Sequence, residues 1–152
     1  MADRELDKTT IVDTLNDLIH TVEDSHEGYR HAAGRAESDD LKALFNDLAA
    51  QRGAIVRELQ RSVAEVGGAP DIGGTVIGGA HRMLLGVREA VLGNDRATLL
   101  AEVQRAESEC VRLYEEALAK ELPPAIADGV SEQLARIRAD LDRMAALRET
   151  IA

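Results

Sequence analysis

Glycine and proline, the residues that interrupt helices, are concentrated in one segment of this chain. Six of the 12 glycines lie between Val66 and Ala80 together with Pro70, and the remaining two prolines are adjacent at 123 and 124. The long stretches on either side are rich in Ala, Leu, Glu and Arg, which all favour helix. Since no segment shows the alternating pattern of a strand, the chain is predicted to be all-α.

Apolar residues recur at spacings of three, four and seven along these stretches, as they do on one face of a helix. Ser38, followed by Asp39 and Asp40, is typical of a helix start, and Asn94 and Pro124 are expected to begin two others. A shorter helix is expected in the connection, at about 76–92. The pattern predicts four long helices at about 10–34, 38–66, 95–121 and 124–148.

The spacing of these helices predicts their arrangement. Short loops make the two helices of a pair antiparallel neighbours, and the long connection after Val66 fits a bundle with one crossover. We therefore expect two helical hairpins joined by the crossover, in one domain over about 10–150 that follows a flexible N-terminus at 1–9.

Composition excludes several classes of protein. The chain has 18 Lys and Arg against 28 Asp and Glu, so its formal net charge of −10 argues against binding nucleic acid or an anionic membrane. Cys110 is the only cysteine, which excludes an intrachain disulfide. No signal peptide or membrane-spanning run is evident, and a cytoplasmic location is expected. With Tyr29, Phe45 and Tyr114 as the only aromatic residues, the core must be aliphatic.

Several short segments together resemble a known family. These are 27–33 (EGYRHAA), 41–45 (LKALF), 51–52 (QR), 67–70 (GGAP), 80–82 (AHR) and the helix containing Glu107, Tyr114 and Ala117-Leu118. Over about 10–148 the chain is similar to a bacterial family of ferritin-like four-helix-bundle proteins catalogued as a domain of unknown function. The resemblance implies an up-down ferritin-like bundle and a bacterial origin, but no established activity. Leu141 stands where many relatives are expected to have His.

Ferritin-like bundles often hold two irons. Such a site takes one Glu from each of two helices and a Glu-x-x-His pair from each of the other two. Glu23 and His26 form one such pair, the chain has no second, and with Glu107 they are the candidate iron or zinc ligands. A second candidate is a surface stripe on the first helix that can bind zinc or copper; it consists of His20, Glu23, Glu27 and His31. His81, on the expected crossover helix, is more simply explained as a packed polar residue.

Arg52 lies between Leu48 and Ile55 on the second helix, about 40° from Leu48 on an ideal helix, and is therefore directed into the core. A buried guanidinium needs a carboxylate, because an unpaired buried charge is very costly. Glu107, near the middle of its helix, is the best partner, and Glu23 is the second choice. The fixed positive charge of Arg52 would oppose a bound dication. The expected polar core cluster is Arg52, Glu107, Gln51, His26 and Gln133.

Three functions fit these patterns. The first is a non-catalytic bundle, stress-associated or acting through an unidentified protein partner, in which a polar cluster replaces a degenerate di-metal site and no cofactor is needed. The second is a cryptic iron- or zinc-binding protein. The third is a carrier of a small ligand, for which the small residues at 32–33 and 49–50 would leave room, although they serve close helix packing equally well. A homodimer is expected, because symmetric dimers are the commonest oligomers.

Overall fold

The computed structural model describes residues 6–70 and 95–149, and these residues form four helices and no strand. The helices are α1 (Lys8–Arg35), α2 (Asp39–Glu65), α4 (Arg96–Leu118) and α5 (Pro124–Glu149). They confirm the all-α prediction and all four long helices. The helix expected at 76–92, and His81 with it, lie outside the described residues.

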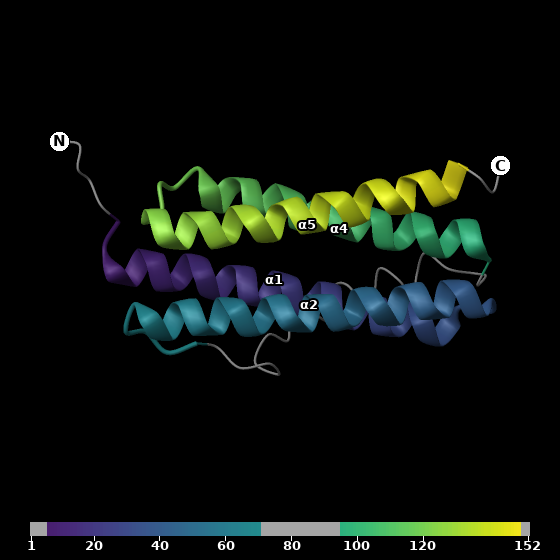
Figure 1. Cartoon of the computed structure of the whole chain (residues 1–152), viewed down its shortest axis with the longest axis horizontal. Helices are drawn as coiled ribbons and strands as arrows, with labels where there is room; N and C mark the ends of the chain where they lie inside the picture. Colours follow the sequence, from purple (N-terminus) through teal and green to yellow (C-terminus); the bar gives the residue numbers. More distant parts are fainter. Residues whose placement is uncertain (1–5, 71–94, 150–152) are drawn as a thin grey trace.

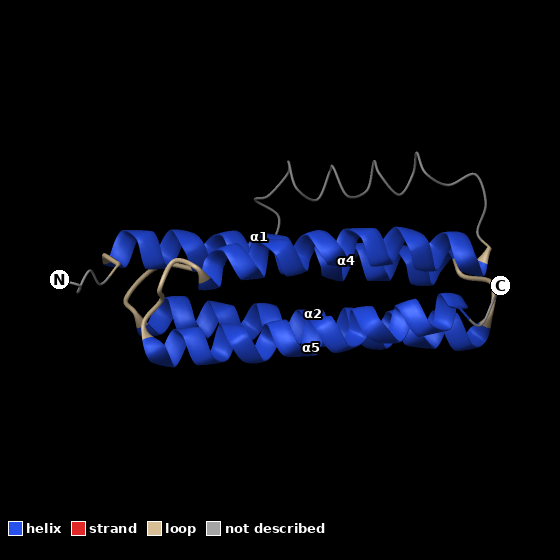
Figure 2. Cartoon of the chain, turned by 90° about the horizontal axis from the view of Figure 1, so that it is seen from above, coloured by secondary structure: helices blue, strands red, loops and turns tan. Residues whose placement is uncertain are grey.

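The four helices form a bundle of two antiparallel hairpins, α1–α2 and α4–α5 (Figure 1). Seen from above, α1 lies beside α4 in one layer, and α2 lies beside α5 in the other (Figure 2). Helices α2 and α4 are therefore diagonal to each other, as are α1 and α5. This is the hairpin arrangement that the loop lengths predicted.

Aspartates begin two of the helices. The Oδ1 of Asp7 accepts a hydrogen bond from the Thr10 backbone N–H at 2.8 Å, and Asp95 does the same for Thr98 at 2.8 Å. Each satisfies a backbone donor that the first turn of a helix leaves without a partner. Two predictions were therefore wrong at the margins: the N-cap of α4 is Asp95 instead of Asn94, and the flexible segment expected through residue 9 overlaps α1, which begins at Lys8.

Two glycines end α2 where the chain must turn closely against α1. Gly67 has φ of +83°, a conformation that residues with a Cβ adopt rarely. A Cβ on Gly68 would lie 2.5 Å from a methyl carbon of Val12. The pair Gly67-Gly68 thus combines a left-handed turn with a close approach to α1.

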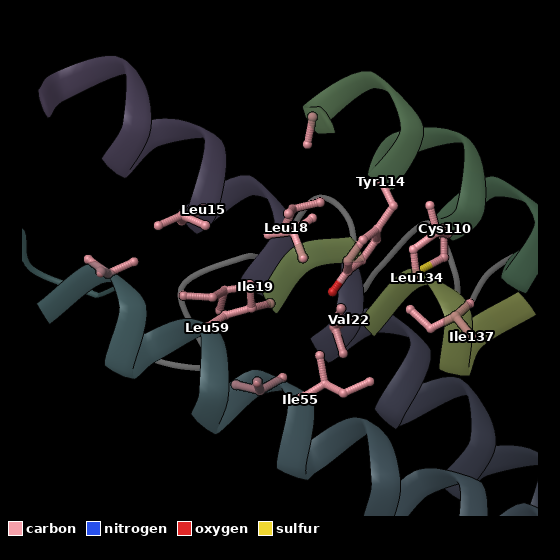
Figure 3. Packing of buried hydrophobic residues seen from close by; sticks show 14 of the residues in the cluster. Leu15, Leu18, Ile19, Val22, Ile55, Leu59, Cys110, Tyr114, Leu134 and Ile137 are labelled. Atoms are coloured by element: carbon pink, nitrogen blue, oxygen red, sulfur yellow. The ribbon is translucent and has the colours of Figure 1, made fainter. Parts of the chain in front are cut away.

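The apolar core is divided into two clusters along the bundle. One, shown in Figure 3, packs residues from the first half of α1, the second half of α2, the second half of α4 and the first half of α5. The other packs residues from Tyr29 to Ala36, Leu41 to Ala49, Leu99 to Val103 and Met144. Ile19 of α1 is fully buried in the first cluster.

A band of polar side chains lies at the junction of the two clusters. On α2 the apolar series jumps from Ala49 to Ile55, and on α4 from Val103 to Cys110. Arg52 occupies the first interval and Glu107 the second, and both are buried. The middle of the bundle is therefore polar and charged, between two aliphatic halves.

Candidate functional site

All four helices contribute buried polar residues to the middle of the bundle. We call Ser25 and Tyr29 of α1, Arg52 of α2, Glu107 of α4 and Asp140 of α5 the polar layer. Each is less than 9% exposed, and Arg52 is completely buried. Ionisable residues are rarely so deeply buried unless they are paired, so their contacts define what the layer does.

Arg52 connects three helices through its guanidinium. Its Nη2 donates to Oε1 of Glu107 at 3.2 Å across the diagonal of the bundle, and its Nη1 donates to Oδ2 of Asp140 at 3.0 Å. The guanidinium carbon also lies 5.5 Å from the centre of the Tyr29 ring, within the range of a cation–π contact. One arginine thus contacts an acidic or aromatic group from each of the other three helices.

Glu107 collects hydrogen bonds on one of its two oxygens. Besides the bond from Arg52, Oε1 accepts from Ser25 Oγ at 3.0 Å and from the Tyr29 hydroxyl at 2.5 Å. The other oxygen, Oε2, is buried and has no hydrogen-bond partner among the described residues. Arg52 Nε is buried and lacks a partner in the same sense. The polar layer therefore contains many hydrogen bonds but leaves these two buried atoms without a partner among the described residues.

The electrostatics of the layer favour the ionised Arg52 and the neutral Tyr29. Burial acts to lower the pKa of Arg52, but the charges of Glu107 and Asp140 outweigh it, so the pKa is raised. Burial, with the nearby Glu107 carboxylate, raises the pKa of Tyr29 well above its usual value of 10.0. Arg52 therefore stays charged and the Tyr29 hydroxyl stays a donor at any physiological pH.

A small pocket opens beside Glu107 between α1 and α4. Its volume is about 20 Å³, and it is lined by Ser25, Gly28 and Tyr29 of α1 and by Glu102, Val103, Ala106 and Glu107 of α4. Both carboxylate oxygens of Glu102 are buried without a hydrogen-bond partner; its nearest cation is Arg35, at 3.6 Å. Burial raises the pKa of Glu102, and Arg35 only partly opposes that rise.

A second polar chain runs outward from the first apolar cluster. The Tyr114 hydroxyl donates to Oε1 of Gln133 at 2.8 Å, and Gln133 Nε2 donates to Glu58 at 3.2 Å. Glu58 also accepts from Arg136 at 2.8 Å, on the exposed side of α2 and α5, and this bond lowers the pKa of Glu58. This chain ties α4, α5 and α2 together and is separate from the polar layer.

The structure brings together only part of the cluster expected from the sequence. The ion pair of Arg52 with Glu107 is present at mid-bundle. Gln133 is buried but belongs to the Tyr114 chain, and Gln51 donates to Asp47 on its own helix. His26 Nδ1 donates to the Ala49 backbone carbonyl at 2.7 Å and so joins α1 to α2 outside the polar layer.

The side chains named as metal ligands do not converge. Glu107 is held by the polar layer, His26 by the Ala49 carbonyl, and the Glu23 carboxylate lies 3.9 Å from His20 Nδ1. On the surface stripe, Glu27 pairs with Arg30 at 3.4 Å. Within residues 6–70 and 95–149, no three His, Cys, Asp or Glu side chains lie together in a way that could hold a metal ion.

Three members of the polar layer were not predicted as such: Asp140, Ser25 and Tyr29. Asp140 interrupts the apolar series between Ile137 and Met144, which is the same signal that identified Arg52. The sequence prediction gave Arg52 a single carboxylate partner, Glu107 or else Glu23, although the guanidinium can bond two carboxylates at once. The position of Asp140 in this apolar series was therefore sufficient to predict that its side chain is directed inward.

Two further observations bear on what the chain can do. Among the described helices, none combines the length and apolar character needed to cross a membrane. Ala32, Ala33 and Ala49, which would leave room for a small ligand, are buried and packed in the second apolar cluster.

Solved structures with the same architecture are ferritin-like proteins. A Dps1 variant of Mycobacterium smegmatis has a TM-score of 0.78 at 12% identity, with 97% of this chain and 99% of that chain covered. A Vibrio cholerae DPS protein, described as one of the ferritin-like diiron-carboxylate proteins, has a TM-score of 0.75 at 13% identity, covering 92% and 89%. A dodecameric thioferritin of Bacteroides fragilis has a TM-score of 0.72 at 17% identity, covering 97% and 90%. At these identities the likeness shows the fold: this chain is a ferritin-like helical bundle.

Comparison by sequence points to a single family. No curated protein matches the chain. The family model described as "Domain of unknown function (DUF2383)" matches residues 10–120, well over half of the sequence, as the resemblance of its segments implied. The chain therefore belongs to this family of unknown function.

Proposed function

We propose that this chain is a non-catalytic ferritin-like bundle protein, in which an ion cluster centred on Arg52 fills the place of a di-metal centre. The observation that carries the proposal is the position of Arg52: fully buried, at mid-bundle, and bonded to carboxylates of two other helices. A residue that cannot lose its proton occupies the space between those carboxylates. The polar layer then has a structural role.

The residues of the polar layer do not fit a pair of iron ions. Such a centre takes four glutamates and two histidines that project inward from four helices. The layer contributes two carboxylates, Glu107 and Asp140, and both already bond the Arg52 guanidinium. A dication placed between them would face a permanent positive charge in a poorly solvated interior. Charge and ligand count both disfavour metal at this point.

Elemental analysis of freshly purified protein, without added metal, tests the proposal. We expect iron and zinc at background level in the wild type and in the Glu107→Gln variant alike. Stoichiometric iron or zinc in the wild type, lost in Glu107→Gln, would overturn the proposal in favour of a cryptic metalloprotein. The matched control is Glu115→Gln, because Glu115 lies on the same helix but is half exposed and paired with Arg138.

The cellular role proposed here is that of a stress-associated or interaction protein of the bacterial cytoplasm. It is supported by the bacterial sources of the three similar structures. The test is the abundance of the protein before and after oxidative stress or starvation, with cell fractionation, and the survival of a deletion strain. Constant abundance and unchanged survival would contradict the role.

We also propose that the chain forms a homodimer. Symmetric dimers are the commonest oligomers, and one of the similar structures is itself described as dodecameric. Light scattering at high protein concentration should give twice the chain mass of 16.4 kDa. A monomer mass would contradict association, and a mass near twelve chains would replace the dimer with a shell.

A further inference from the structure

The pocket between α1 and α4 is lined by two glutamates that have buried carboxylate oxygens without a hydrogen-bond partner among the described residues. Glu107 Oε2 and both oxygens of Glu102 are buried without hydrogen-bond partners, and both residues line the pocket. The two side chains are 2% and 6% exposed. The hydroxyls of Ser25 and Tyr29, which also line it, already donate to Glu107 Oε1. Arg35 Nη1 lies 3.6 Å from Glu102 Oε1, so Glu107 Oε2 and Glu102 Oε2 are the two carboxylate oxygens left without a neighbouring cation or hydrogen-bond partner in the residues that line the pocket.

The size of the pocket limits what can bind there. About 20 Å³ is enough for one water molecule, which needs roughly 10–15 Å³ by the same measure. It is far below the hundreds of cubic ångströms that an organic ligand needs. Any occupant is therefore a single small species, and the lining requires that it donate hydrogen bonds.

We propose that the α1–α4 pocket is a binding site for one fixed water molecule, which donates one hydrogen bond to Glu107 Oε2 and the other to a carboxylate oxygen of Glu102. Buried waters characteristically occupy sites where otherwise unpaired polar groups converge. Because both hydrogens of this water are donated to carboxylates, the site needs no further acceptor. The water is then an integral part of the polar layer.

Desolvation favours water over a small cation. The two carboxylates of the pocket already have cationic neighbours, since Glu107 bonds Arg52, which also bonds Asp140, and Glu102 lies beside Arg35. A neutral donor satisfies the oxygens without a further charge, whereas a cation would bring one into a buried region at a cost in desolvation.

The bridging water links two ion pairs that the helices hold apart. One is Arg52 with Glu107 at the centre of the bundle, and the other is Arg35 with Glu102 nearer the end of α1. A water between Glu102 and Glu107 supplies the donor that Glu107 Oε2 lacks. Hydrogen bonds to an ionised carboxylate favour its charged form, which is the form that binds Arg52.

A crystal structure of the wild-type protein, at a resolution that shows ordered water, tests the site directly. Crystals grown with choline as the only added cation should contain one peak within hydrogen-bond distance of Glu107 Oε2 and a Glu102 oxygen. A pocket without density would overturn the proposal. Density that appears only with added sodium or ammonium ions would also overturn it, because the ligand would then be a cation.

Two isosteric variants give an independent test in solution. Both Ala106→Val and Ala106→Thr fill the pocket with nearly equal volume, but only threonine brings a hydroxyl that can donate to the carboxylates. We expect Ala106→Thr to have a folding equilibrium constant about five to 160 times that of Ala106→Val, the range for leaving a buried acceptor unpaired. Equal stability of the two variants would show that these oxygens need no donor and would contradict the proposal.

Discussion

The guanidinium of Arg52 and the carboxylate of Glu107 meet 3.2 Å apart across the diagonal of the bundle, between helices that are not direct neighbours (Figures 1 and 2). Both side chains are essentially excluded from solvent. The stability of the pair depends on both partners being present, because desolvation offsets much of the attraction between buried charges. Removing one partner is therefore worse than removing both.

A double-mutant cycle measures this relationship. Glu107→Leu should reduce the free energy of unfolding by about 3–5 kcal/mol, since it leaves a buried cation with Asp140 as its remaining charged partner. Arg52→Met should cost less, because a buried carboxyl can take up a proton. The double variant should be more stable than the sum of the two losses predicts, by about 1 kcal/mol or more. Denaturant unfolding of all three gives the coupling.

The exposed pair of Arg138 with Glu115 is the matched control for that cycle. Its side chains are 50% and 52% exposed, so the same substitutions there should show a coupling of about 0–1 kcal/mol. Losses at Arg52 and Glu107 that add within about 0.5 kcal/mol would mean that the two residues do not interact.

The two tyrosines should resist ionisation for as long as the protein is folded. Tyr29 and Tyr114 are the only tyrosines of the chain, and burial raises the pKa of both well above 10.0. The folded state therefore binds protons more tightly than the unfolded state, and stability falls as the pH rises above 10.0. Tyrosinate absorbance should appear together with the loss of helical circular dichroism. Titration near pH 10 with the helices intact would contradict the burial of these hydroxyls.

Glu102→Gln should change stability in a way that depends on pH. Burial raises the pKa of Glu102 above its ordinary value of 4.5, so the folded protein prefers the protonated side chain. The wild type therefore gains stability as the pH falls through the raised pKa, and below 4.5 the carboxyl is neutral in both the folded and the unfolded state. The variant should gain most relative to wild type near neutral pH, and this gain should shrink on acidification. A gain that is constant with pH would contradict the shift.

The two ways in which helices begin here predict different effects of alanine. Asp95→Ala removes the bond to the Thr98 N–H and should lower the melting temperature by a few degrees. Ser38→Ala should lower it less, because the Ser38 side chain makes no capping bond to the helix backbone; its hydroxyl accepts from the Arg96 side chain. The bond from the Thr98 N–H also lowers the pKa of Asp95. Its contribution to stability is therefore present above about pH 3.8, the ordinary pKa of the side chain, and is lost as the pH falls below it. Equal effects of the two variants would contradict the capping geometry.

The sequence was sufficient to predict the helices because their cause is local. Apolar periodicity and the placement of Gly67, Gly68 and Pro124 depend on near neighbours in the chain, and the observed boundaries agree within a few residues. Asn94 and Asp95 are both good N-caps, so only the backbone geometry could decide between them.

Contacts between helices were harder to predict, since they depend on how the helices are rotated and aligned. The inward direction of Arg52 was visible because Leu48 and Ile55 flank it on one face. The direction of Gln51 was not, and its side chain bonds Asp47 instead of the layer. His26 is partly buried, and the bond from its ring to the Ala49 carbonyl depends on the alignment of α1 against α2, which the sequence pattern does not reveal.

The division of the core into two apolar halves also fixes how far each helix can slide. An aliphatic core with few aromatic side chains offers similar contacts after a shift of one helical turn, about 5.4 Å. Such a shift of α2 would carry the Arg52 guanidinium away from Glu107 and Asp140 and into aliphatic packing, where its charge would be unpaired. The polar layer therefore sets the register of the bundle: among arrangements with similar aliphatic packing, it favours the one in which the charged groups of all four helices are paired.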